Sequence, residues 1–375
     1  MKNEANRDKT SIAIISLYPD NTGTSIVVNY YYRALIELGF AAKLYQLVSD
    51  NRISTYPNAD EYIYGMNILP KGLQLPINII FTLPKKIRSM TEDILIITDQ
   101  AASNLNKGRR NSITIVHDVR ELTNYNNTLK KLYFKFILKY LKDSSHIIAV
   151  SEFTKELLAK RFDLKDRVSV VPNCFPNQDY SAIATVRMNQ GVTGKKIVNV
   201  LYVAADRPYK NIDLFLKVAE KISSLTFSLD FHFILVSNLK KKTKKKIRKL
   251  NLQNLQVMHN VENMDSIYEI CDVLMHPSLI EGFGLPIVEA MSHGIPVVHS
   301  NLRPMADIVG EGGLSVDPNV IDDWVNALYK VCIPKNYIEL SKAAYFQARE
   351  FEYEEFKQKL EQVMTNYTSK KPNFS

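Results

Sequence analysis

The stretch VLMHPSLIEGFGLPIVEAM, residues 273–291, contains a strand, a loop and the start of a helix in direct succession. Its first six residues are mostly apolar, which predicts a buried strand. Gly282 and Gly284 then favour a tight loop whose backbone can approach a ligand closely. Pro286 suits the first turn of a helix, where a missing N–H costs nothing. We therefore expect one strand-loop-helix unit of an α/β sheet here.

Short apolar runs rich in Ile and Val recur along the rest of the chain, separated by stretches with helical spacing. Runs that are apolar on both faces are typical of parallel strands covered by helices on both sides. Before residue 175 they are SIAIISLY (11–18), DILIITD (93–99), SITIVHD (112–118), SHIIAVS (145–151) and RVSVVP (167–172). After it they are VNVLYVA (198–204), FHFILVS (231–237), LQVMHN (255–260) and GIPVVHS (294–300). The pattern predicts an α/β protein with two Rossmann-like, doubly wound domains facing a cleft.

The predicted domain boundary lies where this periodicity is lost. Between Pro172 and Lys195 the chain gathers Asn, Pro, Gly and Ser, which is typical of a linker. We expect an N-terminal Rossmann-like domain of residues 1–175 and a C-terminal one of residues 176–350. The remaining C-terminal helix and tail, residues 351–375, are expected to pack back on the N-terminal domain.

Composition excludes several classes of protein. With 46% hydrophobic and 23% charged residues over 375 positions, the chain is too apolar for disorder. No apolar run approaches the ~20 residues of a membrane span, and the run after the polar first ten residues is too short for a signal peptide. Three widely separated cysteines exclude a disulfide scaffold and indicate a reduced compartment, so we expect a cytoplasmic protein. A net charge of +9 favours an anionic partner without identifying it.

Two carboxylates bracket the loop after the strand at 273–278. Glu281 precedes the glycines and Glu289 lies near the start of the following helix. One interpretation is structural, because acids near helix starts complement the helix dipole. The other is functional, because carboxylates form bidentate hydrogen bonds with vicinal sugar hydroxyls and exposed N–H groups at a helix start bind phosphate.

The string EGFGLPIVEAM resembles the Glu-x7-Glu element of retaining GT-B glycosyltransferases of family 4, the glycosyl transferases group 1. This resemblance implies that Glu281 is catalytic and lies near the transferred sugar, while Glu289 holds the ribose of the nucleotide. It also implies that loop amides meet the sugar hydroxyls and the diphosphate of the donor. The residues that supply them are Gly282, Phe283, Gly284 and Leu285.

A second element, VLYVAADRPYKNIDLFLKV (200–218), is similar to the family pattern G-[R or T]-x-x-P-x-K-N. Lys210 and Asn211 match it, and the resemblance implies that Lys210 is a catalytic cation for the leaving diphosphate. Ala204 replaces the usual Gly, and Ala205 occupies the place of a phosphate-binding Arg. Arg207 either substitutes for that Arg or is an exposed loop residue. The resemblance further places the nucleobase at the backbone of Asn260 and Val261.

Two elements of the first half complete the resemblance. Gly23 lies in a strand-to-helix turn where the family has a Gly-Gly pair, but here Thr24 follows it, so a plain turn remains an alternative. His117 and Asp118 end the run SITIVHD, as in the family's His-Asp element. The resemblance implies a catalytic His117 that faces the transferred sugar, with Asp118 orienting it. A structural or merely exposed histidine is the alternative from the residues alone.

Taken together, these elements predict a metal-independent, retaining hexosyltransferase. It would move a hexose from GDP-mannose or a UDP-hexose on the C-terminal domain to an acceptor hydroxyl at the N-terminal domain. The acceptor would be a glycan or a lipid-linked molecule, in glycan or glycolipid synthesis. No cofactor is expected besides the nucleotide-sugar substrate, because the histidines have no metal-ligand spacing and no Asp-x-Asp follows a strand. The alternatives are a GT-B epimerase or phosphorylase and a noncatalytic basic-surface binding protein.

Two basic stretches remain. LKKLYFKFILKYLKD (129–143) mixes lysines with apolar residues at helical spacing, which fits either docking on an anionic membrane at the inner face or a core-facing helix with snorkelling lysines. KKKTKKKIRK (240–249) is denser and predicts a solvated helix. No aromatic stacking set accompanies it, so we expect no nucleic-acid partner.

Overall fold

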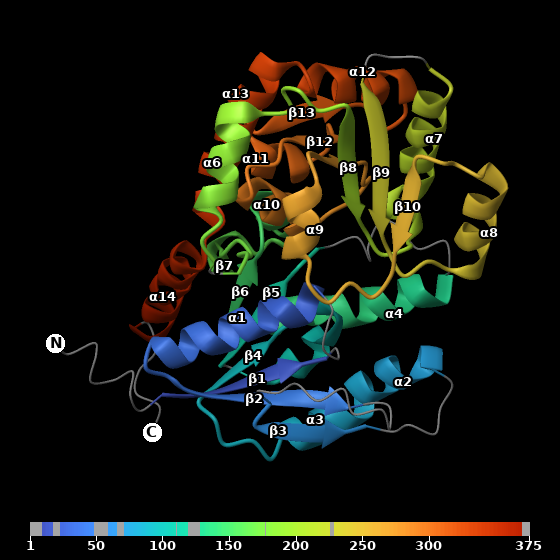
Figure 1. Cartoon of the computed structure of the whole chain (residues 1–375). Coiled ribbons are helices and arrows are strands. Elements are labelled where there is room, and N and C mark those ends of the chain that lie inside the picture. Colours follow the sequence, from blue (N-terminus) through green and yellow to red (C-terminus); the bar gives the residue numbers. More distant parts are fainter. Residues whose placement is uncertain are drawn as a thin grey trace. The chain divides into compact units, whose positions relative to one another are not determined.

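The computed structural model describes residues 10–17, 23–48, 59–65, 71–109, 111–118, 128–176, 178–225 and 229–369 (Figure 1). The chain forms two compact units. The first comprises residues 1–174 together with 353–375, and the second comprises residues 175–352.

The first unit contains a seven-stranded sheet of order β3-β2-β1-β4-β5-β6-β7, and all of its neighbouring strands pair in parallel. The strands are β1 (Ser11–Ser16), β2 (Ala41–Val48), β3 (Glu61–Tyr64), β4 (Ile94–Ile97), β5 (Ser112–Val116), β6 (His146–Ala149) and β7 (Val168–Val170). The helices are α1 (Gly23–Glu37), α2 (Lys71–Ile77), the π-helix η1 (Asn78–Thr82), α3 (Leu83–Ile87), α4 (Thr128–Leu138), α5 (Glu152–Phe162) and α14 (Tyr353–Ser369). Short 3₁₀ segments are η2 (Gln100–Asn106), η4 (Lys139–Asp143) and η5 (Lys165–Arg167).

The second unit contains a six-stranded parallel sheet of order β10-β9-β8-β11-β12-β13. The strands are β8 (Ile197–Val203), β9 (Asp230–Val236), β10 (Leu255–Met258), β11 (Val273–His276), β12 (Val297–Ser300) and β13 (Gly313–Val316). The helices are α6 (Ser181–Gln190), α7 (Ile212–Ser223), α8 (Lys241–Leu250), α9 (Asp265–Ile270), α10 (Leu285–Ser292), α11 (Met305–Val309), α12 (Ile321–Val331) and α13 (Pro334–Ala348). Short 3₁₀ segments are η6 (Pro208–Lys210) and η7 (Arg349–Phe351).

Alternation along β8 explains how the second core forms. Val198, Val200 and Tyr202 lie on one face of the strand, because side chains alternate with a period of two, and they join a buried cluster with Phe215 of α7 and Trp324 of α12. The central strand β11 is buried at every position. Helices therefore cover the apolar strands, which confirms the predicted fold class of two parallel Rossmann-like sheets.

Several elements differ from the sequence-based expectation. Strands β2 and β3 were not predicted, because their exposed and buried residues mix without the long apolar runs of central strands. Helix α6 lies inside the predicted linker of residues 172–195, where Arg187 is buried and bonds four backbone carbonyls. The C-terminal helix expected within residues 351–375 is α14, which begins at Tyr353, and the 3₁₀ segment η7 separates it from α13.

Helix α14 packs within the first unit, against α1. The Tyr31 and Phe356 rings meet edge to face at 4.9 Å. Arg33 lies 4.5 Å from the centre of the Tyr353 ring, and Lys357 Nζ pairs with Glu37 Oε2 at 3.1 Å. The end of the chain thus belongs to the same unit as its first strand.

Strand order reverses at one point in each sheet. In the first unit the reversal lies between β1 and β4, and in the second between β8 and β11. Ligands of open α/β sheets bind beyond the carboxyl ends of strands at such switch points, because adjacent loops there lead away in opposite directions. None of the described helices is both long and apolar enough to cross a bilayer.

Candidate functional site

Three charged or polar side chains meet at the β8/β11 switch point of the second unit. Lys210 Nζ donates to both carboxylate oxygens of Glu281, at 2.6 Å to Oε1 and 2.8 Å to Oε2. His276 Nε2 lies 2.9 Å from Glu281 Oε1. The side chains of Glu281 and Lys210 are only 7% and 17% exposed, so this ion pair is largely removed from water. We call Lys210, His276 and Glu281 the Glu281 cluster.

Strand pairing brings these residues together. Val273 and Leu274 of β11 are in register with Val200 and Leu201 of β8, so the loops that follow the two strands are neighbours. The Tyr202 hydroxyl donates to the Lys210 carbonyl and lies 3.2 Å from Ser278 Oγ, which ties one loop to the other. The sheet therefore positions Lys210 against an acid 71 residues later in the chain.

Electrostatics keeps Glu281 ionised. Burial by itself raises the pKa of its carboxyl, but the Lys210 ammonium and the His276 hydrogen bond outweigh burial and hold that pKa well below its usual range. Burial lowers the pKa of His276, although Glu281 acts in the opposite sense. A neutral His276 must then carry its hydrogen on Nε2, because a carboxylate can only accept. His276 is thus a fixed donor to an ionised acid.

The loop after Glu281 opens helix α10. Gly284 is the residue before the helix and has φ of 109°, a left-handed conformation that favours glycine. A Cβ at this position would meet the Ile287 side chain at 3.0 Å. Pro286 has no N–H, and the Ile287 N–H donates to the Gly284 carbonyl at 2.9 Å, so the Leu285 N–H is the one of these three available to an external acceptor at the helix start.

Glu289 lies in α10 and has a different environment. Its Oε2 accepts a 2.7 Å hydrogen bond from the Tyr268 hydroxyl of α9. Burial raises the pKa of the Glu289 carboxyl; the Tyr268 bond opposes this effect and the nearby Asp265 carboxylate adds to it. Next to it, His293 Nδ1 donates to the Glu289 carbonyl at 2.8 Å. The Glu289 carboxylate therefore accepts from a neutral phenol, and no cation among the described residues pairs with it.

The other binding residues predicted for this unit lie in three loops, and not all of them contact Glu281 or Glu289. Arg207 precedes η6 with an exposed side chain, and it takes no part in the hydrogen bonds of the Glu281 cluster. Asn260 is exposed with φ of 49°, and Val261 is half-buried, in the loop between β10 and α9. Phe283 is buried against the ring of Phe351, at 5.4 Å between centres. Gly282 is buried as well, and Leu285 begins α10.

Two predicted residues lie in the first unit. Gly23 is the exposed first residue of α1, the helix that follows β1 in the chain. His117 follows β5 and is half-buried. Its ring Nε2 donates to the Thr98 carbonyl at 2.8 Å, and its backbone N–H donates to Gln100 Oε1 at 3.0 Å. Asp118 beside it is buried. These contacts fix the orientation of the imidazole within its own unit.

Sequence reasoning missed His276 and Tyr268, which hold the two acids. His276 was considered only for a metal-ligand spacing, whereas it ends the strand five residues before Glu281. That position at a strand's carboxyl end was the available signal. Tyr268 offered none, because its contact with Glu289 depends on how α9 packs against α10.

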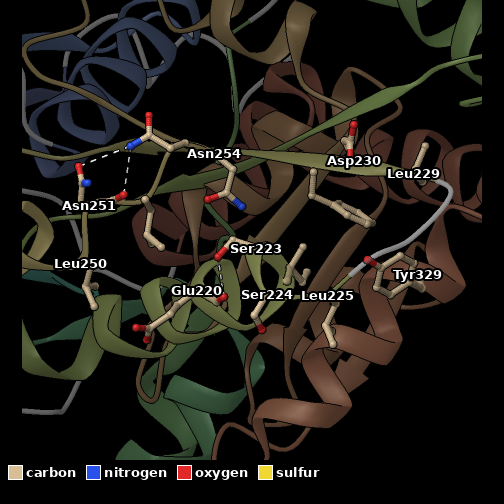
Figure 2. A pocket seen from close by; sticks show the side chains of 14 residues that line it. Glu220, Ser223, Ser224, Leu225, Leu229, Asp230, Leu250, Asn251, Asn254 and Tyr329 are labelled. Atoms are coloured by element: carbon tan, nitrogen blue, oxygen red, sulfur yellow. Dashed lines mark hydrogen bonds between the residues drawn. The ribbon is translucent and has the colours of Figure 1, made fainter.

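A separate cavity of about 610 Å³ lies in the same unit, at the end of the sheet where β9 begins (Figure 2). Asp230, Glu220, Asn251, Asn254 and Tyr329 are among the residues that line it. Neither acid of the candidate site is among them. Over the described residues, no group of three or more His, Cys, Asp or Glu side chains could hold a metal ion.

Comparisons with known families cover both units. Residues 187–351 match the family described as glycosyl transferases group 1, and residues 21–177 match the family described as glycosyltransferase family 4. The O-antigen chain mannosyltransferase RfbU of Salmonella typhimurium is 27% identical over 235 residues. That match covers 59% of this chain and 61% of RfbU, so the chain spans less than two thirds of this relative.

Solved structures share the fold at low sequence identity. Sucrose-phosphate synthase from Thermosynechococcus elongatus superposes with a TM-score of 0.77 at 16% identity, covering 97% of this chain and 100% of that one. HepE from Anabaena, solved with UDP-glucose, has a TM-score of 0.74 at 17% identity, covering 95% and 99%. At these identities the likeness concerns the fold alone.

Proposed function

The chain belongs to the glycosyl transferases group 1, family 4 of the retaining GT-B glycosyltransferases, and from this premise we propose that it transfers a hexose from a nucleotide-diphosphate sugar to an acceptor hydroxyl. The donor is GDP-mannose or a UDP-hexose, in glycan or glycolipid synthesis. RfbU is a mannosyltransferase and HepE was solved with UDP-glucose, so both donor classes have a precedent among the matches.

The observation that carries this proposal is the Glu281 cluster beside the uncapped start of α10. N–H groups at a helix start favour anionic oxygen, and a Lys ammonium is a point charge suited to phosphate. A diphosphate at this loop would draw Lys210 away from its bidentate contact with Glu281. His276 would keep Glu281 in place while that exchange occurs, because its hydrogen bond does not involve Lys210.

In the proposed reaction the bond between the anomeric carbon and the diphosphate breaks as the acceptor oxygen attacks from the same face. The departing phosphate accepts the acceptor's proton. Lys210 and the amides of residues 282–285 stabilise the charge that develops on the diphosphate. Glu281 stabilises positive charge on the sugar without forming a covalent bond to it, and Glu289 accepts hydrogen bonds from the ribose hydroxyls.

Residues of the first unit are assigned to the acceptor side. We assign His117 to the transferred sugar and Gly23 to close backbone approach, on the resemblance of their motifs. The acceptor is a glycan or a lipid-linked molecule, and α4 would hold the enzyme on the inner face of an anionic membrane. Exposed Lys131 and Lys135 support this location.

The two acids provide the sharpest test of the assignment. Glu281→Gln should lower kcat by about 100-fold and leave nucleotide affinity nearly unchanged, because its charge acts on the transition state. Glu289→Gln should instead weaken nucleotide binding by about tenfold, since a hydrogen bond to a charged acceptor is lost. Thermal shift with UDP, GDP and ADP measures binding, and transfer of labelled hexose measures turnover.

The opposite pattern, with Glu281→Gln weakening nucleotide binding and Glu289→Gln slowing turnover, would reject the roles. If the protein bound nucleotide but converted the donor to free epimerised sugar, the epimerase alternative would replace the transferase. If it needed inorganic phosphate as acceptor, it would be a phosphorylase.

A further inference from the structure

A cavity of about 260 Å³ in the first unit combines positive charge with apolar walls. Arg88, Lys107 and Arg109 line it, together with Ile80, Leu105 and Phe136. Its cations come from the segments just before β4 and β5, away from His117, which follows β5. We call this cavity the Arg88 pocket.

The cations of the Arg88 pocket have no ion-pair partner in the described part of the protein, although the Glu92 carboxylate acts on the charge of Arg109 from outside the lining. No carboxylate lines the cavity there, and Arg88, Lys107 and Arg109 form no ion pair with a described residue. Arg109 is anchored by one hydrogen bond, from Nη2 to the Ile87 carbonyl at 2.6 Å. Three like charges around one small space repel one another, and a bound anion would relieve that repulsion.

Large apolar side chains stand exposed beside the pocket. Phe81 is 63% exposed on η1, next to the lining residue Ile80. Leu132 and Phe136 are 58% and 45% exposed on α4, and they share one face of the helix because they are four residues apart. Exposed apolar groups gathered beside cations are typical of surfaces that enter the interface of a membrane.

The packing of α4 is consistent with both alternatives predicted for residues 129–143, a core-facing helix and a helix that docks on a membrane. Ile137 and Leu138 are buried in the two cores of the first unit, so one face of the helix does cover the core. The other face carries Leu132, Phe136 and exposed lysines. Lys139 Nζ lies 4.4 Å from the centre of the Phe136 ring, so the positive charge adjoins the apolar surface.

We propose that the Arg88 pocket binds the phosphate headgroup of an anionic phospholipid while Phe81, Leu132 and Phe136 enter the bilayer interface. Arg88 and Lys107 meet the phosphate, and the apolar rim meets the acyl chains. The rim discriminates against nucleic acid, because a polyphosphate chain would leave these apolar side chains in water. This inference rests on the proposed function insofar as a lipid-linked acceptor requires the enzyme at a membrane.

Helix α8 supplies a matched control surface. It is rich in lysine, but none of the large apolar side chains that stand exposed belongs to it. Lys241 and Lys245 are exposed there, as Arg88 and Lys107 are in the first unit. The double variants Arg88→Gln/Lys107→Gln and Lys241→Gln/Lys245→Gln therefore change the net charge equally at two different places.

The experiment is co-sedimentation of the full chain with vesicles of phosphatidylcholine, with and without phosphatidylglycerol. The native protein should bind only the vesicles with phosphatidylglycerol. Each basic side chain near an anionic surface contributes about a fivefold factor, so the Arg88/Lys107 variant should bind about 25-fold more weakly. The Lys241/Lys245 variant should change by less than about twofold. Equal loss of vesicle binding in both variants would overturn the proposed headgroup site, because the net positive charge of the protein would then account for the binding.

The apolar rim has its own matched pair. Phe136→Ser should weaken binding to the mixed vesicles by about tenfold, whereas Phe346→Ser, which removes an exposed ring from α13, should not. Displacement from the vesicles by inorganic phosphate at the concentration of the lipid would instead identify a free-phosphate site. If the protein bound poly-uridine RNA more tightly than the mixed vesicles, and if that binding depended on Arg88 and Lys107, the lipid headgroup would be rejected as the ligand.

A readout without vesicles separates this proposal from the proposed function. All four variants should retain the thermal shift that the native protein shows with its nucleotide, which also establishes that they fold. If the native protein shows no shift with any nucleotide, the proposed function fails while the vesicle result still stands. If nucleotide binds but vesicles with phosphatidylglycerol do not, only the present inference fails.

Discussion

Glu281 and Glu289 are eight residues apart in one loop and helix, yet their environments shift the pKa values of the two carboxyls in opposite directions. Glu281 accepts two hydrogen bonds from a cation and one from a neutral imidazole, which depress its pKa. Glu289 accepts its hydrogen bond from a neutral phenol, and burial together with Asp265 raises its pKa.

This difference in pKa suits the two acids of the Glu-x7-Glu element to two different tasks. An acid paired with a lysine remains charged at any ordinary pH, which suits a group that stabilises positive charge near a reacting sugar. A carboxylate that is not paired with a cation can still accept hydrogen bonds, which suits a group that binds an incoming ligand. Substitutions around each acid should therefore have different effects.

The largest expected effect comes from Lys210→Ala. Removal of the cation should lower the transfer rate by about 100- to 1,000-fold, because charge on the leaving diphosphate loses its partner. It should also cost about 3 kcal/mol of unfolding free energy, since Glu281 is left buried without its counter-ion. Steady-state kinetics and urea unfolding measure the two effects.

Lys195→Ala is the matched control for that change. Lys195 also pairs with a largely buried acid, Asp272, outside the Glu281 cluster. The control should lose stability and keep its transfer rate. Equal losses of rate in both variants would mean that Lys210 acts only through folding.

His276→Phe should have a smaller effect. The ring keeps the buried volume filled but cannot donate to Glu281, so kcat should fall by about tenfold while KM for the donor stays constant. His276→Gln retains a donor and should recover part of the loss. An unchanged kcat in the Phe variant would exclude His276 as a positioning residue for Glu281.

The pH dependence of stability should differ in sign between the two acids. The pKa of Glu281 is lowered from the ordinary 4.5, so its stabilising contribution is present above that value and lost as pH falls toward the depressed pKa. The pKa of Glu289 is raised from 4.5, so the native protein loses stability as pH rises through it.

Urea unfolding at several pH values measures this contrast. The cost of Glu281→Gln should be largest at neutral pH and shrink in acid, whereas the cost of Glu289→Gln should shrink as pH rises. Each unit of pKa shift corresponds to about 1.4 kcal/mol, which sets the size of the divergence. Parallel curves for the two variants would remove the contrast between the acids.

The smallest expected effect is that of EDTA. Because Lys210 and the amides at the start of α10 are proposed to meet the diphosphate, chelation should leave the transfer rate unchanged within about twofold. Loss of activity that magnesium restores would show that a cation shares this task.

Part of this arrangement could be predicted because its cause is local. The apolar runs that became β1, β4 and β11 are buried on both faces wherever they lie, so their character as parallel strands is visible in composition. The loop at Gly282–Gly284 and a helix with Pro286 in its first turn were predictable for the same reason, since backbone freedom is a property of the residue. Strand β2 and the edge strand β3 were missed because their partial burial depends on neighbours.

The sequence by itself determined the two parallel sheets, the strand-loop-helix unit at residues 273–291 and the identity of both acids. Only the tertiary structure decided that Lys210 and His276 hold Glu281, that Tyr268 holds Glu289, and that α14 lies with the first unit. The physical reason is that strand order places β8 beside β11, and this adjacency brings together loops far apart in the chain. Charge, burial and pKa follow from such neighbours, so they emerge only with the folded sheet.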